Sequence, residues 1–311
     1  MTTPASARIH DDIHGQLTHG IRLRRFAGPA AYVGALDHIR VVHLTDLHVG
    51  RVTPRKVHVA AMEMTNAQRP DLVVITGDFV CHSQAYLDEL TSLMRMIQAP
   101  VYGVLGNHDH WSGAREVRRA LRRGGVHMLD NVHTTVTVRG QKLQLVGIDD
   151  AYTGHARKAE ATRGLDPRVP TLGLSHIAEE ADALWQHGVS LVLSGHTHAG
   201  QVTVAKLHEF AIGKLAGHRY VHGLYGSRAT GAGAVYVGAG IGASVIPFRI
   251  GERGKREVTV FELGMRPGDI HEHHAEQEPL PGRRPSEKVQ ARRAAFAARR
   301  RAKLDKRLRA R

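Results

Sequence analysis

Short runs of apolar, mostly β-branched residues recur along the chain, and each run ends in a cluster of polar residues. Runs of this length, closed by polar or turn-forming residues, are typical of strands that are buried on both faces. We therefore predict buried strands at residues 39–44, 72–76, 101–105, 143–148, 171–174 and 191–193.

Segments with apolar residues at helical spacing lie between several of these strands. They predict helices at residues 55–68, 84–97, 115–123 and 178–187, and Gly188 is placed to end the last of them. Strands that alternate with helices predict a layered α/β core.

One hairpin interrupts this alternation, because residues 134–147 alternate between apolar and polar on both sides of Arg139 and Gly140. An antiparallel hairpin beside parallel strands predicts mixed sheets. Residues 152–170 have weak periodicity, and we expect a long loop near the strand ends, where such loops often shape substrate access.

The composition changes after Leu263. Residues 264–285 are rich in Pro, Gly and His and are typical of a linker. Residues 281–311 hold 13 Lys or Arg against two acidic residues, which is +11 of the formal net charge of +14. This tail has almost no large apolar residues and cannot form a core face of its own. We expect a solvated charged helix or a disordered extension there, and the alternative is adhesion to an anionic membrane surface or to nucleic acid.

Three further features concern the compartment. The single cysteine, Cys81, excludes an intrachain disulfide and fits a reducing compartment; we expect it to be a small buried hydrophobe beside a strand end. The first residues lack the basic-then-apolar pattern of a secretion signal. The uncharged run at 229–248 contains five glycines and favours strands and tight turns over a membrane span. We therefore expect a cytoplasmic protein, with peripheral binding to the inner membrane face as the alternative.

Residues that bind metals follow five of the predicted strands. Because the carboxyl ends of strands in an α/β sheet share one rim, such residues can meet there although they are far apart in the sequence. A single match is weak, since a lone strand-end His or Asp is more often a capping residue. Five such strand ends in succession are much stronger evidence. The residues at these five strand ends are Asp46, His48, Asp78, Asn107, His108, Asp109, His176, His196 and His198.

The types of these residues indicate the kind of site. Carboxylate, carboxamide and imidazole ligands without thiolates suit Mn²⁺, Fe, Zn²⁺ or Ni²⁺ better than they suit a closed structural zinc site. Seven ligands are too many for one tetrahedral ion, whereas two ions that share a carboxylate fit them. Two divalent ions neutralised in part by two carboxylates keep positive charge for a phosphate ester, as a two-metal hydrolase requires.

The succession of motifs resembles the calcineurin-like metallophosphoesterases in order and in approximate spacing. The matching residues are Asp46-x-His48, Gly77-Asp78, Gly106-Asn107-His108-Asp109, His176 and Gly195-His196-x-His198. The resemblance spans residues 39–263 and implies a four-layer α/β/β/α sandwich of two mixed sheets flanked by helices. It divides the chain into an N-terminal extension (1–38), a metallophosphoesterase domain (39–263) and a linker with a basic tail (264–311).

The resemblance also implies a role for each residue. Asp46, His48, Asp78 and His198 would hold one divalent ion, Mn²⁺ foremost, with Asp78 as the bridge. Asn107, His176 and His196 would complete the site of the second ion. His108 would lie over the phosphate and assist the leaving group, with Asp109 orienting it.

This reading implies a phosphoesterase that hydrolyses phosphodiester or pyrophosphate bonds by a hydroxide that bridges the two ions. The stretches HAGQV, RYVHGLY and YVGAGIGASVIPFR look like the bacterial branch that contains membrane-associated phosphodiesterases and UDP-2,3-diacylglucosamine pyrophosphatases. The alternatives are a catalytically silent metal-binding scaffold and a nucleic-acid phosphodiesterase. No pattern in the sequence indicates an oligomeric state.

Overall fold

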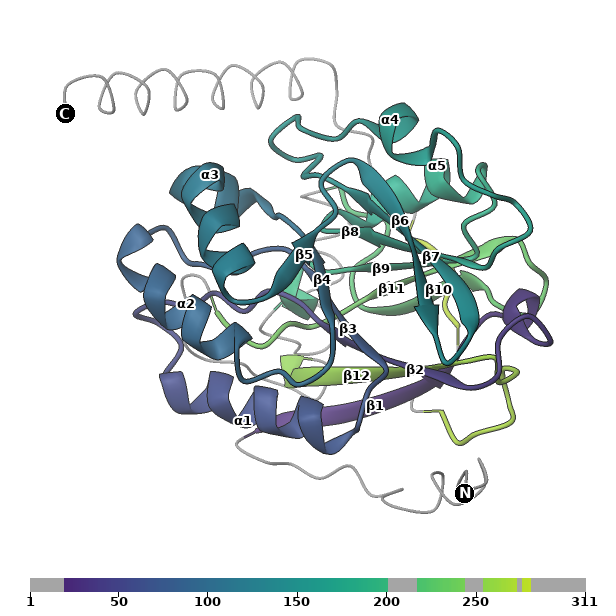
Figure 1. Ribbon diagram of the computed structural model, residues 1–311, viewed down its shortest axis with the longest axis horizontal. Helices are drawn as coiled ribbons and strands as arrows, with labels where there is room; N and C mark the ends of the chain where they lie inside the picture. The colour runs from purple at the N-terminus through teal and green to yellow at the C-terminus, as the bar shows by residue number, and fades with distance from the viewer. Residues whose placement is uncertain (1–19, 201–216, 244–253, 273–275, 281–311) are drawn as a thin grey trace.

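A computed structural model describes residues 20–200, 217–243, 254–272 and 276–280 of the chain. Two six-stranded sheets pack face to face, and helices cover the outer face of each (Figure 1). Both sheets contain parallel and antiparallel pairs. The expected four-layer α/β/β/α sandwich of two mixed sheets is therefore confirmed.

The first sheet has the strand order β1-β12-β2-β3-β4-β5. Strands β2 to β5 run parallel to one another, while β12 pairs antiparallel with β2 and parallel with β1. Because β2, β3 and β4 point the same way, their carboxyl ends lie on one edge of the sheet. The strands are β1 (Ile21–Ala27), β2 (Ile39–Leu44), β3 (Leu72–Thr76), β4 (Val101–Val104), β5 (Val126–Met128) and β12 (Arg256–Leu263).

The second sheet has the strand order β10-β11-β9-β8-β7-β6, with four parallel strands between two antiparallel edge strands. The hairpin of β6 and β7 is the predicted one. Arg139 and Gly140 form its turn with φ angles of 48° and 81°, as a two-residue type I′ turn requires. The strands are β6 (Val132–Val138), β7 (Gln141–Ile148), β8 (Thr171–Ser175), β9 (Leu191–Ser194), β10 (Gly223–Ser227) and β11 (Gly233–Val237).

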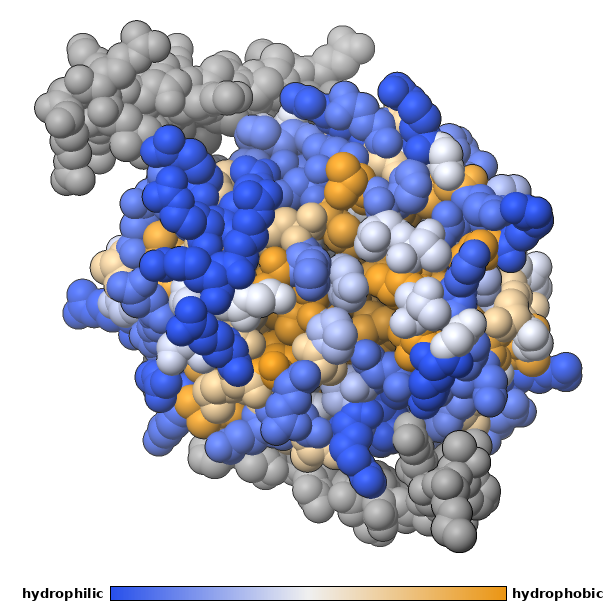
Figure 2. Space-filling view, in the orientation of Figure 1, coloured by the Kyte–Doolittle hydropathy of each residue, from blue (hydrophilic) through white to orange (hydrophobic). Residues whose placement is uncertain are grey.

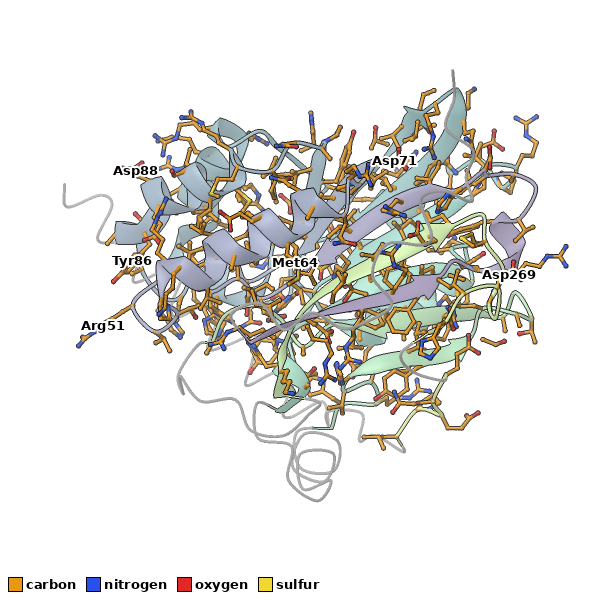
Figure 3. The ribbon with its side chains drawn as sticks, turned by 90° about the horizontal axis from the view of Figure 1, so that it is seen from below. Arg51, Met64, Asp71, Tyr86, Asp88 and Asp269 are labelled. Carbon is orange, nitrogen blue, oxygen red and sulfur yellow. The ribbon has the colours of Figure 1, made fainter. Side chains whose placement is uncertain are left out.

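Helices α1 (Arg55–Ala67), α2 (Leu87–Met94) and α3 (Asn107–Arg123) pack on the outer face of the first sheet. The short helices α4 (Lys158–Thr162) and α5 (Ala181–Trp185) pack on the outer face of the second. A view from below shows α1 lying along the first sheet, where Met64 packs against the core beneath the helices (Figure 3).

The continuous apolar runs of the sequence follow from this layering. In β3, Val73 and Ile75 join the core under the helices, while Leu72 and Val74 join the core between the two sheets. Both faces of the strand are therefore buried, and polar residues on either face would be costly. This core between the sheets fixes how the two strand-end rims face each other.

The observed helices differ from the predicted ones mainly at their ends. The segment predicted as 84–97 is a 3₁₀ turn (Gln84–Tyr86) followed by α2, and the segment predicted as 178–187 is a 3₁₀ turn (Ala178–Glu180) followed by α5. Helix α3 begins at Asn107 rather than at 115. Its first turns carry polar residues, and a kink at Gly113 with φ of 112° breaks the apolar period.

Described parts of both flanking segments pack against the sandwich. Strand β1 lies within the stretch that we assigned to an N-terminal extension, yet it pairs with β12 along its whole length. On the other side, Arg228 forms ion pairs with Glu272 and Glu276 of the predicted linker. Residues 1–19 of the extension and the basic tail 281–311 lie outside the described residues.

The uncharged run at 229–248 is described as far as residue 243. It contains β11 and glycine-rich turns rather than a helix. Within the described ranges, no helix combines the length and the apolar character needed to cross a bilayer.

Candidate metal centre

The predicted metal-binding residues follow strands of both sheets. Asp46 and His48 follow β2, Asp78 follows β3, and Asn107 follows β4 as the first residue of α3. From the second sheet, His176 follows β8, and the pair His196 and His198 follows β9. The two rims face each other, so side chains from the two sheets converge on one cluster.

The backbone at this cluster is unusual. Five of the predicted ligands have a positive φ, which is uncommon for residues other than glycine and costs about 1–3 kcal/mol each. Backbone hydrogen bonds hold the strand ends in place: Asp46 N–H donates to Gly77 O, and His48 N–H donates to Asp78 O. The five residues are Asp46, His48, Asp78, His196 and His198.

Asp46, His48, Asp78 and His198 form the first group, and one ligand atom from each lies within 4.8 Å of all the others. His48 Nε2 lies 2.9 Å from His198 Nε2 and 3.4 Å from Asp78 Oδ2, while His198 Nε2 lies 3.3 Å from Asp46 Oδ1. Bonds of about 2.0–2.2 Å to one ion place neighbouring ligand atoms about 3 Å apart. The spacings therefore fit the shell of one cation.

Asn107, His176 and His196 form a second group beside the first. Asn107 Oδ1 lies 3.2 Å from His176 Nε2 and 3.0 Å from His196 Nδ1. His176 Nε2 also lies 3.4 Å from Asp78 Oδ2, the same oxygen that faces His48 in the first group. One carboxylate oxygen is thus shared by both groups, as a bridging ligand would be.

The electrostatics of the cluster fit cations. Burial raises the pKa of the Asp46 carboxyl to about 7, and Asp78 contributes to the shift. Burial alone would lower the pKa of His176, but the nearby Asp78 and Asp46 raise it to about 10. Asp46 Oδ1 is buried and accepts no hydrogen bond from the described part of the chain. In protein alone the carboxylates thus depend on a buried imidazolium, and divalent ions would supply that charge directly.

Outer contacts orient these ligands. Asp46 Oδ2 accepts hydrogen bonds from Thr45 Oγ1 at 2.8 Å and from His196 N–H at 3.0 Å, which leaves Oδ1 directed at His198. Thr76 O accepts a hydrogen bond from His176 Nδ1 at 2.8 Å. Because Nδ1 is the donor there, Nε2 of a neutral His176 carries the lone pair toward the cluster.

His108 lies at the edge of the cluster and is mostly buried, with a small part of its side chain exposed. Its Nε2 lies 3.9 Å from Asp78 Oδ2, and its ring meets the His48 ring edge to face at 4.6 Å between centroids. It is therefore close enough to act on a ligand bound at the cluster while keeping some access to solvent.

Asp109 has a different environment from the one that we expected. Its carboxylate accepts hydrogen bonds from Gly106 N–H at 2.9 Å and from Val80 N–H at 3.1 Å. It thus ties together the loops that follow β3 and β4. The expected orienting contact with His108 stays a prediction.

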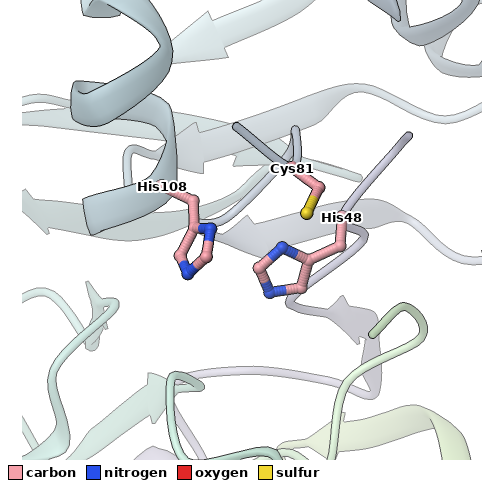
Figure 4. Close-up of side chains that lie close together, drawn as sticks. All are labelled: His48, Cys81 and His108. Atoms are coloured by element: carbon pink, nitrogen blue, oxygen red, sulfur yellow. The ribbon is translucent and has the colours of Figure 1, made fainter. Parts of the chain in front are cut away.

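Cys81 lies in the site, which its sequence environment did not indicate. One atom from each of Cys81, His48 and His108 lies within 4.8 Å of the other two (Figure 4). The thiol is partly exposed rather than fully buried. Burial raises its pKa, and so does the charge of Asp78, so it carries little thiolate at neutral pH.

Aromatic side chains outside the sequence motifs also border the cluster. The Trp111 ring centroid lies 4.8 Å from that of His108 and 6.0 Å from that of Tyr152, which in turn lies 5.4 Å from that of His196. Tyr152 begins the segment predicted to lie near the strand ends. Trp111 belongs to none of the sequence motifs. It reaches the cluster because it lies in the helical turn that follows His108.

The fold and the site define a class: a two-sheet α/β sandwich with a cluster of potential metal ligands where the strand ends of both sheets meet. A model of the calcineurin-like phosphoesterase family matches residues 39–200. The chain belongs to this family, whose members use divalent metals at a dinuclear site. The resemblance inferred from the motifs is confirmed.

Curated relatives agree with this assignment. The chain is 29% identical to phosphodiesterase YaeI of Escherichia coli (strain K12), over 72% of this chain and 82% of that protein. It is 30% identical to the uncharacterized metallophosphoesterase YkuE of Bacillus subtilis (strain 168), over 73% of this chain and 79% of that protein. It is also 30% identical to a transmembrane protein with a metallophosphoesterase domain from Bos taurus, over 75% of this chain and 54% of that protein.

Proposed function

We propose that this protein is a dinuclear metal-dependent hydrolase of phosphodiester or pyrophosphate bonds. The observation that carries the proposal is the single Asp78 oxygen that lies 3.4 Å from His48 of one ligand group and 3.4 Å from His176 of the other. Asp46, His48, Asp78 and His198 hold one ion, and Asn107, His176, His196 and Asp78 hold the other. Mn²⁺ is the ion that we expect.

Bound ions supply an activated water and positive charge toward the phosphoryl oxygens. The protein's part is to hold the ligands before the substrate arrives. Buried carboxylates and imidazoles fixed by Thr45, Thr76 and the strand-end backbone need no rearrangement when the ions bind. The left-handed backbone occurs at five of these ligands, which belong to both ligand groups.

His108 donates a proton to the leaving oxygen. Its Nε2 lies beside Asp78 but belongs to neither ligand group, and the side chain keeps 12% of its surface exposed. An imidazole can hold or release a proton near neutral pH, which suits a general acid. The name of the relative YaeI, a phosphodiesterase, supports a diester as the substrate class.

The first test is hydrolysis of bis-p-nitrophenyl phosphate with Mn²⁺ by Asp78→Asn. We expect the rate to fall by at least about a hundredfold, because an amide cannot supply the negative charge that two ions share. Asp88→Asn is the matched control, since Asp88 is 93% exposed on α2. If Asp78→Asn hydrolyses the diester as fast as the control, the proposal is wrong.

The second test separates metal binding from proton transfer. His108→Ala is expected to retain its metal content and to lose most rate with poor leaving groups, such as alkoxides, and least with p-nitrophenolate, which needs no proton. Equal losses of rate for both kinds of leaving group would contradict proton donation by His108. That result would leave the proposed metal centre unaffected.

A further inference from the structure

One face of helix α3 is crowded with arginines. They follow one another at spacings of three and four residues, so that they lie on the same side of the helix. The space-filling view shows the most hydrophilic side chains gathered over α3 (Figure 2). The residues are Arg115, Arg118, Arg119, Arg122 and Arg123.

These arginines are only partly balanced by acids. Arg118 pairs with Asp130 at 2.6 Å and with Asp149 at 3.0 Å, so these two carboxylates neutralise its charge. Arg115 pairs with its neighbour Glu116, and Arg123 pairs with Asp88 on α2, a carboxylate so exposed that water screens the pair. Among the described residues, no acid lies within ion-pair distance of Arg119 or Arg122.

Four of the side chains line a shallow hollow of about 430 Å³, namely Arg115, Arg119, Arg122 and Arg123. No acidic, aromatic or aliphatic residue is part of that lining. A further guanidinium lies at its end, since Arg95 Nε donates a hydrogen bond to Arg123 O at 3.2 Å. The hollow is therefore a concave surface whose lining residues are all positively charged.

Folding does not explain this arrangement. The dipole of α3 favours cations in its last turn, which accounts for Arg122 and Arg123 but not for Arg115 and Arg119. Like charges at a spacing of four residues, such as Arg115 with Arg119 and Arg119 with Arg123, repel each other and destabilise a helix. An anion in the hollow would turn this repulsion into attraction.

We propose that the α3 hollow binds phosphate groups that together carry two or more negative charges. Guanidinium forks bind phosphate oxygens in pairs, with geometry that a lysine cannot match. The absence of aromatic rings from the lining disfavours stacking of a nucleobase, so the recognised feature is the phosphate itself. The two sources of such a group are the headgroups of anionic phospholipids and a free phosphate compound.

The hollow is separate from the metal centre but belongs to the same helix. Asn107 and His108 begin α3, and Arg119 lies at most about 18 Å further along it. A phosphate-bearing surface bound by the arginines would therefore lie close to the strand ends that carry the metal ligands. The proposal does not depend on the proposed hydrolysis, because it concerns binding alone.

The first arm of the test uses a free phosphate compound. Binding of methylenediphosphonate is measured by titration calorimetry on the full chain and on the double variant Arg119→Glu/Arg122→Glu. The control is Arg69→Glu/Arg163→Glu, which has the same change of charge at exposed positions outside the hollow. Loss of two charge-assisted contacts should weaken binding by at least about tenfold in the first variant, and less than about twofold in the control.

The second arm uses vesicles of phosphatidylcholine with about 30 mol% phosphatidylglycerol, against vesicles of phosphatidylcholine alone, in a sedimentation assay at low and at physiological salt. The basic tail is present in all three proteins, so its contribution cancels. A loss confined to Arg119→Glu/Arg122→Glu on vesicles supports lipid headgroups as the source, and a loss confined to the diphosphonate supports a free compound. Equal binding by both double variants in both arms, or no binding by the parent chain, overturns the proposal.

Discussion

His48 and His198 are 150 residues apart in the sequence, yet their Nε2 atoms lie 2.9 Å apart in the candidate metal centre. The two rings stack with their centroids 4.8 Å apart. One histidine comes from each sheet, so the short distance measures how closely the two strand-end rims face each other. A cation bound by both nitrogens would link the two sheets where their strand ends meet.

Metal removal should therefore reduce the stability of the whole sandwich. At an ion concentration of about one hundred times Kd, binding to the folded state adds about 2.7 kcal/mol, which raises Tm by several degrees. We expect Mn²⁺ to raise Tm of the chelator-treated protein, and His198→Gln to lose most of this shift. His127→Gln, an exposed histidine on β5, is the control. An equal shift in both variants would show that His198 does not bind the ion.

Gly195 should tolerate no side chain, because a Cβ there would lie 2.0 Å from Thr45 Oγ1 and 2.3 Å from Asp46 Oδ2. Gly195→Ala is expected to displace the Asp46 carboxylate and to reduce diester hydrolysis by at least about a hundredfold, since a shift of 1 Å can cost that much. Gly188→Ala is the comparison: it has open space but a φ of 80°. It should lose about 1 kcal/mol of stability and keep its activity. The opposite order of activities would contradict the steric argument.

Glu257 should be needed for both stability and activity. Its carboxylate accepts hydrogen bonds from Tyr236 Oη at 2.8 Å and Ala239 N–H at 2.7 Å, and it pairs with the buried Arg24. Burial opposes its ionisation, but Arg24 and His222 hold its pKa well below the usual range. Removing one partner of a buried pair costs about 3–5 kcal/mol. We expect Glu257→Gln to lose that much in urea unfolding, and the exposed Glu63→Gln to lose almost nothing.

The same variant should impair the metal centre. Ala239 begins the segment whose Ile241 N–H donates to Thr45 O at 3.1 Å and whose Gly242 N–H donates to Asp46 O at 2.7 Å. Glu257 therefore holds the backbone that positions Asp46. Weaker Mn²⁺ binding by Glu257→Gln, measured at a temperature where it is fully folded, is the expected result. Unchanged affinity would restrict Glu257 to a structural role.

Glu262 should give the protein a defined loss of stability in acid. Burial opposes its ionisation, but hydrogen bonds from His38 and Arg40 lower its pKa from 4.5 to about 2. A carboxyl whose pKa is lowered by folding stabilises the protein above the unfolded pKa, and this contribution is lost as pH falls from about 4.5 to about 2. The full contribution is about 3 kcal/mol. The difference in unfolding free energy between the parent and Glu262→Gln should therefore shrink between pH 5 and pH 2.5. A constant difference would contradict the assignment.

Several parts of the fold were predictable from the sequence for clear physical reasons. The strand at 72–76 is apolar on both faces because it lies between two cores, and Arg139 with Gly140 marks a hairpin because the turn requires positive φ. Strand β1 was missed because its arginines interrupt the apolar run: the buried Arg24 pairs with Glu257, more than 200 residues away. The start of α3 was missed because its first turn carries site residues in place of an apolar face.

The sequence by itself determined which residue types end the strands, and hence the chemistry: carboxylate, carboxamide and imidazole ligands in the order of one family. Local sequence is enough to predict these ligand types, because each strand end can be recognised from the residues next to it. Only the tertiary structure decided that one oxygen of Asp78 faces both ligand groups, that Cys81 and Trp111 border them, and that the α3 arginines share one hollow. Those distances depend on how two sheets pack across a buried core, which no local pattern specifies.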